Sequence, residues 1–229
     1  MNNIKNVAIF GDSILKGVQI NAETGRYYTD NSIDFAALER DFSLKIENFS
    51  SFGCTVAKGY GLIERFFANG NTCDMVIMDY GGNDCDYKWS EVAENPTGEH
   101  LPKVPWAEFE ETYHRLIELI RANRAQPVLC TLPPLQGQWF FDWFCRDLDK
   151  AAILSRIGDV STIFNHQGDY SRLVEKIAGE AKVPLIDLRS AFMAHDDYSK
   201  LLCEDGTHTN TLGQGVISSV LYEYFGRNK

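Results

Sequence analysis

Short apolar runs alternate along the chain with longer segments whose apolar residues recur at helical spacing. The first run, residues 7–10, ends at Gly11 before a polar pair, which predicts a buried strand that leads into a helix. Residues 44–49 alternate between apolar and polar, as is typical of a half-exposed edge strand. Further strands are predicted at 74–80, 127–132 and 184–188, helices at 35–42, 56–68, from Pro105 onward, and at 146–157, 170–182 and 211–225, and loops at 21–34, 85–104 and 201–210.

Strands that alternate with helices predict a parallel sheet covered on both faces, which is a three-layer α/β/α sandwich. The half-exposed second strand suits a sheet edge, so we expect a flavodoxin-like, five-stranded parallel sheet with the order 2-1-3-4-5. The chain has 229 residues, of which 44% are hydrophobic, and no repeat or linker divides it. The sequence therefore predicts a single domain over residues 1–229.

Three of the predicted strands end at residues suited to acyl-transfer chemistry. Ser13, Gly53 and Asn83 follow the first, second and third strands. Because sites in open parallel sheets form at these strand ends near the switch point, we expect the three residues on one rim. They offer a hydroxyl nucleophile, an unobstructed backbone N–H and a carboxamide donor. Taken alone, Ser13 or Asp12 is more commonly a helix cap.

A base for this site occurs late in the chain, in the segment Asp205-Gly206-Thr207-His208. One loop can then present a carboxylate to one imidazole nitrogen and leave the other nitrogen for Ser13. A metal site on Asp205 and His208 is the alternative, but no third ligand has a suitable spacing, so we predict no metal and no cofactor. Asp12 and Asp84 are expected to bind backbone groups of their own loops.

These segments resemble the blocks of the SGNH/GDSL hydrolase family, the GDSL-type esterases and lipases. Gly11-Asp12-Ser13-Ile14 resembles its GDS(L) block, and Gly53 stands where the family has an isolated glycine. Gly81-Gly82-Asn83-Asp84 resembles the GxND block, and residues 205–208 resemble the DxxH block. The four blocks occur in the family's order and span nearly the whole chain.

The resemblance implies the same fold and an enzyme that hydrolyses carboxylic esters, a GDSL-type esterase or acylhydrolase. Ser13 is implied as the nucleophile, His208 as the base and later the acid, and Asp205 as the carboxylate that orients the imidazole. The implied oxyanion hole consists of the backbone N–H groups of Ser13 and Gly53 and the side chain of Asn83.

Aromatic residues after two strand ends are candidates for substrate binding. Trp89 lies in the polar excursion at 85–104, and Trp139 and Trp143 belong to the cluster at 139–144. A wall for an acyl or sugar-ester pocket and ordinary packing or a subunit interface are equally compatible with them. The polar excursion and acidic surface favour short-acyl esters or O-acetylated carbohydrate as substrates. An acyltransferase with the same acyl-enzyme, and a catalytically silent carbohydrate-binding module, remain alternatives.

Composition narrows the class of partner. The net charge of −10 argues against nucleic acid and anionic membranes as partners, which leaves a small-molecule ester. We expect no signal peptide before the first strand and no membrane-spanning run. Six scattered cysteines are interpreted as reduced, which predicts a cytoplasmic protein. The oligomeric state, including a homo-oligomer, stays open.

Overall fold

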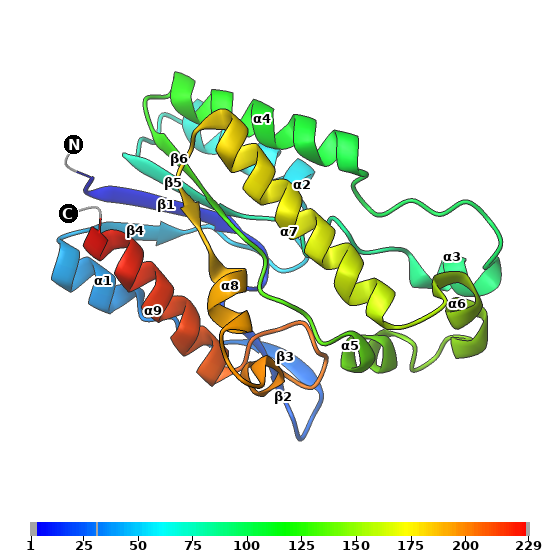
Figure 1. The fold of residues 1–229 in the computed structure, drawn as a ribbon. Coiled ribbons are helices and arrows are strands. Elements are labelled where there is room, and N and C mark those ends of the chain that lie inside the picture. Colours follow the sequence, from blue (N-terminus) through cyan, green and yellow to red (C-terminus); the bar gives the residue numbers. More distant parts are fainter. Residues whose placement is uncertain (1–3, 31, 228–229) are drawn as a thin grey trace.

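The computed structural model describes residues 4–30 and 32–227. The expectation that no signal peptide precedes the first strand concerns residues 1–3 in part, and these lie outside the described residues. Its centre is a parallel sheet in the order β4-β1-β5-β6-β7 (Figure 1). When only the strands of this sheet are numbered in chain order, their order is the predicted 2-1-3-4-5. The labels after β1 are two higher because a hairpin of two strands, which the sequence does not predict, follows β1. The strands are β1 (Asn6–Gly11), β4 (Lys45–Asn48), β5 (Met75–Asp79), β6 (Gln126–Cys130) and β7 (Leu185–Ile186).

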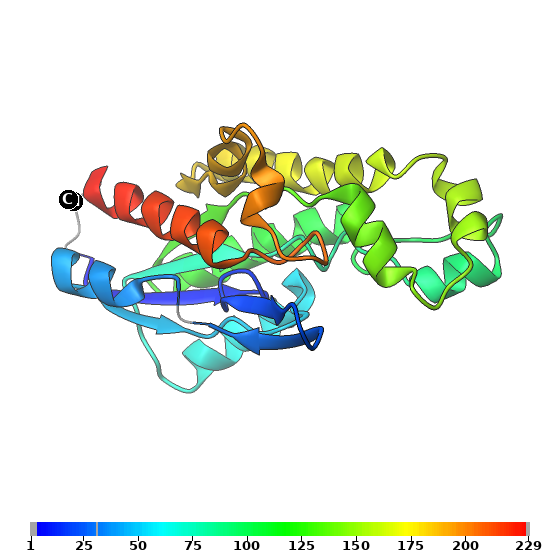
Figure 2. The same cartoon turned by 90° about the horizontal axis from the view of Figure 1, so that it is seen from below.

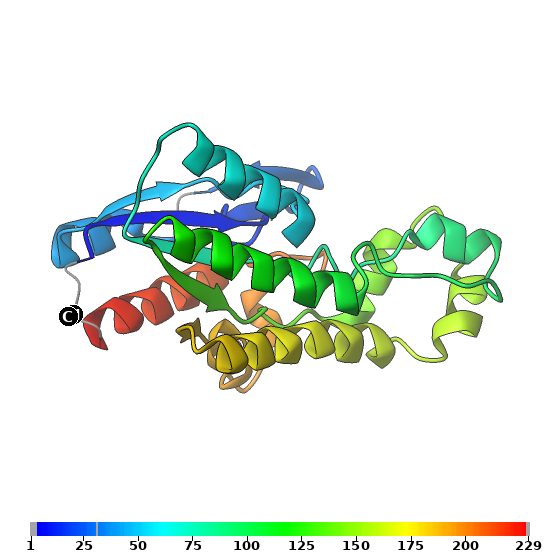
Figure 3. The ribbon, with the colours of Figure 1, turned by 90° about the horizontal axis from the view of Figure 1, so that it is seen from above.

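Alternate side chains of β1 enter two separate cores, which confirms the three-layer arrangement. Ala8 and Phe10 pack in the core under one helical layer, and Val7 and Ile9 pack under the other. Figure 3 looks onto the first layer and Figure 2 onto the second, on opposite sides of the sheet. The first layer holds α2 (Val56–Ala68), α4 (Trp106–Ala122) and α7 (Ser161–Ala181), and the second holds α1 (Phe35–Phe42), α8 (Leu188–Met193) and α9 (Thr211–Arg227).

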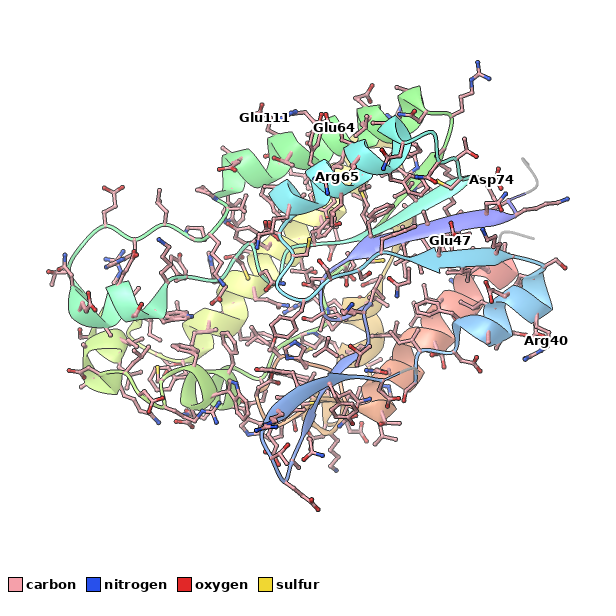
Figure 4. All side chains as sticks on the ribbon, turned by 180° about the vertical axis from the view of Figure 1, so that it is seen from behind. Arg40, Glu47, Glu64, Arg65, Asp74 and Glu111 are labelled. Atoms are coloured by element: carbon pink, nitrogen blue, oxygen red, sulfur yellow. The ribbon has the colours of Figure 1, made fainter. Side chains whose placement is uncertain are left out.

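The edge strand β4 carries charged side chains toward solvent, as its alternating pattern predicts. Lys45 and Glu47 form an exposed ion pair of 3.0 Å, and Glu47 is visible on the outer edge of the sheet in Figure 4. Charges on an edge strand oppose pairing with a further strand. The sheet therefore ends at β4, and β1 is left in its interior beside the switch point.

The segment after β1 differs from the prediction of a helix beginning at Ser13. The N–H of Gly17 donates to the carbonyl oxygen of Ile14 (3.0 Å). The N–H of Val18 donates to that of Ser13 (2.9 Å), and the two bonds together form a Schellman motif. Gly17 has a φ of +75°, and a Cβ there would lie 2.4 Å from the carbonyl oxygen of Asp30. The predicted helix is therefore reduced to a single turn.

An antiparallel hairpin, β2 (Val18–Asn21) and β3 (Arg26–Thr29), takes up much of the predicted loop at 21–34. The turn between the strands is closed by the N–H of Gly25, which donates to the carbonyl oxygen of Asn21 (2.8 Å). The β-branched and aromatic residues of the two strands favour a hairpin. The sequence nevertheless predicts a loop here, because the segment is also rich in polar residues. The hairpin matters because it carries Tyr27 to the candidate site.

A group of short helices extends beyond the sheet at one end of the molecule (Figure 1). We call α3 (Trp89–Glu94), α5 (Gly137–Phe144) and α6 (Lys150–Ile157) the cap. The cap has an apolar core of its own, in which Trp89 stacks on Phe144 with ring centroids 4.3 Å apart. α3 and α5 are not predicted by the sequence, and α7 begins at Ser161 rather than at residue 170.

Candidate active site

A chain of hydrogen bonds joins three buried side chains at the carboxyl end of β1. The Nε2 atom of His208 lies 2.8 Å from the Oγ atom of Ser13, and its Nδ1 atom lies 2.5 Å from Oδ2 of Asp205. The exposed fractions are 6% for Ser13, 6% for His208 and 0% for Asp205. The structure thus brings together all three residues that the sequence implies for a triad, in the relative order that proton transfer from the hydroxyl requires.

Asp205 is held as a carboxylate beside the imidazole. Its Oδ1 atom accepts hydrogen bonds from the backbone N–H groups of Thr207 and His208, both at 3.1 Å. Burial by itself raises the pKa of Asp205, but the hydrogen bonds from His208 and Thr207 and the charge of His208 outweigh it and lower this pKa below its ordinary value. The loop from Asp205 to His208 therefore supplies a charged acceptor that fixes the proton on Nδ1 of His208.

Two aromatic rings hold the imidazole of His208 in place. The ring of Phe52 stacks on it with a centroid distance of 5.7 Å and an interplanar angle of 8°. The ring of Tyr27 lies 5.1 Å away, and its hydroxyl lies 3.4 Å from Oδ2 of Asp205. Trp143 donates to the Tyr27 hydroxyl through Nε1 at 3.0 Å. Phe52 is a site residue that the sequence analysis missed, although its place directly before Gly53 is a usable signal.

Of the three expected oxyanion donors, Ser13 and Asn83 line the cavity at the site, whereas Gly53 is not among its lining residues and follows Phe52, whose ring stacks on His208. Within residues 4–30 and 32–227, no backbone group accepts a hydrogen bond from the N–H of Ser13 or of Gly53. Asn83 lines the cavity beside Ser13 and uses one of its two N–H hydrogens on Oδ2 of Asp12 (3.0 Å). Gly53 has a φ of +67°, and no atom lies within 4 Å of a Cβ built there, so the backbone conformation alone favours glycine.

Asp12 links the strand ends that carry these donors. Its Oδ1 atom accepts from the N–H of Ile14 (2.8 Å), as expected for its own loop, and Oδ2 accepts from Asn83. Burial raises the pKa of Asp12 to about 6, while the hydrogen bonds from Ile14 and Asn83 and the charge of His208 act in the opposite direction. Asp12 therefore orients the carboxamide of Asn83.

Asp84 binds outside its own loop as well as within it. Its Oδ1 atom accepts from the N–H of Val56 (2.8 Å), the first residue of α2, so it ties the loop after β5 to the helix that follows Gly53. A carboxylate at a helix N-terminus satisfies one of the unpaired N–H groups there. Burial, reinforced by the charge of Asp12, raises the pKa of Asp84 to about 7.

A cavity of about 140 Å³ opens beside Ser13, His208 and Asn83. Of the three tryptophans proposed from the sequence, Trp143 lines this cavity. Trp139 does not: it borders a separate outer hollow that also includes Trp143. Trp89 lines a second cavity next to the first. The site cavity also contains Gln167 and Asp79, which the sequence analysis did not single out.

One group of acidic and histidine side chains elsewhere has the spacing of a metal site. Ligand atoms of Glu110, His114 and Glu180 lie within 4.8 Å of one another. The ammonium group of Lys176 already contacts both glutamates, at 2.6 and 3.8 Å. A cation of the protein itself thus offsets part of the negative charge of this group, which is not part of the candidate active site. Among the described helices, none has both the length and the apolar character needed to cross a bilayer.

A flavodoxin-like sandwich with a Ser–His–Asp hydrogen-bond chain at the carboxyl ends of its strands has the architecture of a serine hydrolase. The chain belongs to the GDSL-like lipase/acylhydrolase family, whose sequence model matches residues 9–216. It is accordingly an ester-hydrolysing enzyme of that family. No curated protein sequence gives a significant match.

Solved structures share the fold over almost the whole chain. A lipase/acylhydrolase from Enterococcus faecalis is 17% identical with a TM-score of 0.68, and the match covers 98% of this chain and 97% of that one. An acetyl xylan esterase from Geobacillus stearothermophilus is 18% identical with a TM-score of 0.67, with the same coverage of 98% and 97%. At such identities the likeness concerns the fold.

Proposed function

We propose that the protein is a serine esterase in which Ser13 attacks the carbonyl carbon of a carboxylic ester. His208 takes the Ser13 proton on Nε2 as the Oγ–C bond forms, and Asp205 stabilises the resulting imidazolium. The oxyanion accepts hydrogen bonds from the N–H groups of Ser13 and Gly53 and from the free N–H of Asn83. His208 then returns the proton to the leaving alkoxide, which gives the alcohol and an ester of Ser13.

In the second half of the reaction, water takes the place of the alcohol and hydrolyses the ester of Ser13. His208 removes a proton from a water molecule as the water oxygen attacks the carbonyl carbon of the acyl-Ser13 ester. The oxyanion forms in the same donor site, and the proton passes from His208 to Oγ of Ser13 as that bond breaks. The products are a carboxylic acid and the free enzyme.

The hydrogen bond of 2.8 Å between Nε2 of His208 and Oγ of Ser13 is the observation that carries this proposal. A helix-capping serine would direct its hydroxyl to a backbone N–H, whereas this hydroxyl lies against an imidazole whose other nitrogen bonds a carboxylate. The complete set of groups also argues against a silent binding module, which needs none of them.

For the substrate we propose a small-molecule ester with a short acyl group, of which O-acetylated carbohydrate is one class. The exposed rings of Tyr27 and Phe52 at the mouth of the site suit stacking against a sugar in the alcohol part. Two of the structural neighbours are named acetyl xylan esterases, which supports the same class.

Hydrolysis of p-nitrophenyl acetate by the wild-type protein and by Ser13→Ala tests this function. We expect at least a thousandfold lower kcat for Ser13→Ala, because the nucleophile is lost, and no change for Ser219→Ala, whose hydroxyl bonds a carbonyl on α9. Equal turnover by wild type and Ser13→Ala would overturn the proposal. Product analysis with added glycerol or sugar separates hydrolysis from acyl transfer to an alcohol.

A further inference from the structure

A second cavity of about 210 Å³ adjoins the one that contains Ser13. It lies between the cap and the first turns of α7, where Leu135, Ile157 and Ile163 contribute to its lining. The two cavities have a common wall, formed by Gly82, Asp86, Phe140, Gln167 and Thr207. Gly82 directly precedes Asn83, so the common wall has a residue without a side chain next to the reacting centre.

Two polar side chains that line the second cavity, Asp86 and Gln167, already have hydrogen-bond partners within the protein. Asp86 accepts from Nε1 of Trp89 (2.8 Å) and from Nζ of Lys103 (2.7 Å). Gln167 donates to the carbonyl oxygen of Pro133 (2.7 Å) and accepts from Arg189 (2.6 Å). A sugar with several hydroxyl groups would find few free partners among these groups, whereas an alkyl chain needs none.

His166 fits the same apolar character. A ring nitrogen of His166 lies 3.0 Å from the carbonyl oxygen of Cys85, and burial lowers the pKa of the imidazole, which favours its neutral form. The ring also packs against Tyr87 and Tyr170, with centroids 5.3 Å away in each case. His166 therefore adds no charge to the cavity near neutral pH. The charged residues of the lining are Arg156, which is exposed on α6, and Asp86, which is paired with Lys103.

The position of His208 decides which half of an ester faces the second cavity. Its Nε2 atom must protonate the leaving oxygen, so the alcohol lies on the His208 side of the site. That side is open to solvent, because Tyr27 and Phe52, which flank the imidazole, are 41% and 53% exposed. The acyl group then extends away from His208, toward Gly82 and Phe140 and the cavity beyond them.

We propose that the second cavity is an acyl-binding pocket that accepts a linear alkyl chain, which extends the substrate class from short to medium-chain acyl esters. This inference rests on the proposed function of Ser13 and His208. A volume of about 210 Å³ corresponds to about seven atoms of methylene or water size, at about 30 Å³ each. Together with the carbonyl carbon, the pocket holds an acyl group of about eight carbons.

A chain-length series of p-nitrophenyl esters tests the pocket. For the wild type, kcat/KM rises from acetate to octanoate by about fourfold per buried methylene and then falls for laurate, which no longer fits. Ile157→Trp, in the cavity wall at the end of α6, lowers kcat/KM for octanoate at least tenfold and leaves acetate within twofold. Leu154→Trp, on the exposed side of the same helix, changes neither.

Turnover of acetate reports that each variant is folded. Thr162→Trp, in the same lining at the start of α7, provides a second blocked pocket if Ile157→Trp is unstable. The pocket proposal is overturned if octanoate activity survives in both blocked variants, or if the wild-type kcat/KM does not rise beyond acetate. In either case the proposed function stays intact as long as acetate hydrolysis depends on Ser13. Loss of Ser13 dependence for acetate instead overturns the proposed function itself.

Discussion

The hydroxyl of Tyr27 lies 3.4 Å from Oδ2 of Asp205, the oxygen that also binds His208. Trp143 holds the same hydroxyl through its indole N–H at 3.0 Å. Hydrogen bonds thus connect the cap, the hairpin β2–β3 and the loop that carries Asp205 and His208. Tyr27 is therefore a positioning residue, because it acts on the imidazole through the carboxylate and through ring contact.

Removal of this hydroxyl should affect turnover more than binding. We expect Tyr27→Phe to lower kcat about threefold to tenfold, the net value of one ordinary hydrogen bond, with little change in KM for p-nitrophenyl acetate. Burial raises the pKa of Tyr27 to about 12, so the hydroxyl stays protonated over the working pH range. Tyr28→Phe is the control, since the Tyr28 hydroxyl faces Gln19. Equal kinetics for Tyr27→Phe and wild type would contradict the role.

Asn83→Ala tests the carboxamide as an oxyanion donor. Loss of one such donor lowers kcat by about 10²- to 10³-fold, because the donor acts on charge that develops only in the transition state. KM should change much less, and the thermal unfolding midpoint should stay close to that of wild type. A folded Asn83→Ala protein with full activity would refute the assignment.

The turn that follows Ser13 can be tested at Gly17, with Gly25 in the hairpin turn as a matched control. Both glycines have positive φ values, +75° and +64°. Alanine at either position costs about 1 kcal/mol in backbone strain. At Gly17 the added Cβ would also lie 2.4 Å from the carbonyl oxygen of Asp30, whereas at Gly25 it meets nothing within 4 Å. We expect Gly17→Ala to lower the free energy of unfolding in urea clearly more than Gly25→Ala. Equal losses would show that the contact relaxes without cost.

Asp84 should make stability depend on pH. Its pKa is raised from 3.8 to about 7, so between these values the folded state holds a proton that the unfolded chain releases. The free energy of unfolding therefore falls as pH rises from about 4 to 7. Asp84→Asn keeps an acceptor oxygen for the N–H of Val56 and cannot ionise. We expect a flatter dependence of its thermal midpoint between pH 4.5 and 8, and a slope equal to that of wild type would contradict this.

The sheet and the triad could be predicted because both depend on local signals at strand ends. The apolar runs establish the strands, the exposed second strand establishes the edge, and the order then places Ser13 between the segments that hold Gly53 and Asn83. His208 and Asp205 needed only their spacing within one loop. A cytoplasmic location stays a prediction, and the oligomeric state stays open.

The turn after Ser13 and the cap could not be predicted for physical reasons. The turn after Ser13 ends at Gly17, whose φ is positive. The Asp30 carbonyl, thirteen positions away in the chain, excludes a side chain at Gly17, and no local pattern reveals that contact. The aromatic residues of α5 do not show a simple apolar stripe, since Phe141 is buried in the cap core while Trp139 on the same helix faces solvent. Cap helices obtain their stability from packing on one another rather than from intrinsic propensity.

Labelling with a fluorophosphonate, which reacts with an activated serine, tests the central claim most directly. Peptide mapping by mass spectrometry should locate the phosphonyl group on Ser13 in the wild type. His208→Ala should label at least a hundredfold more slowly, because the base that lies 2.8 Å from Oγ is gone. A label on a different residue, or equal rates for wild type and His208→Ala, would contradict the account.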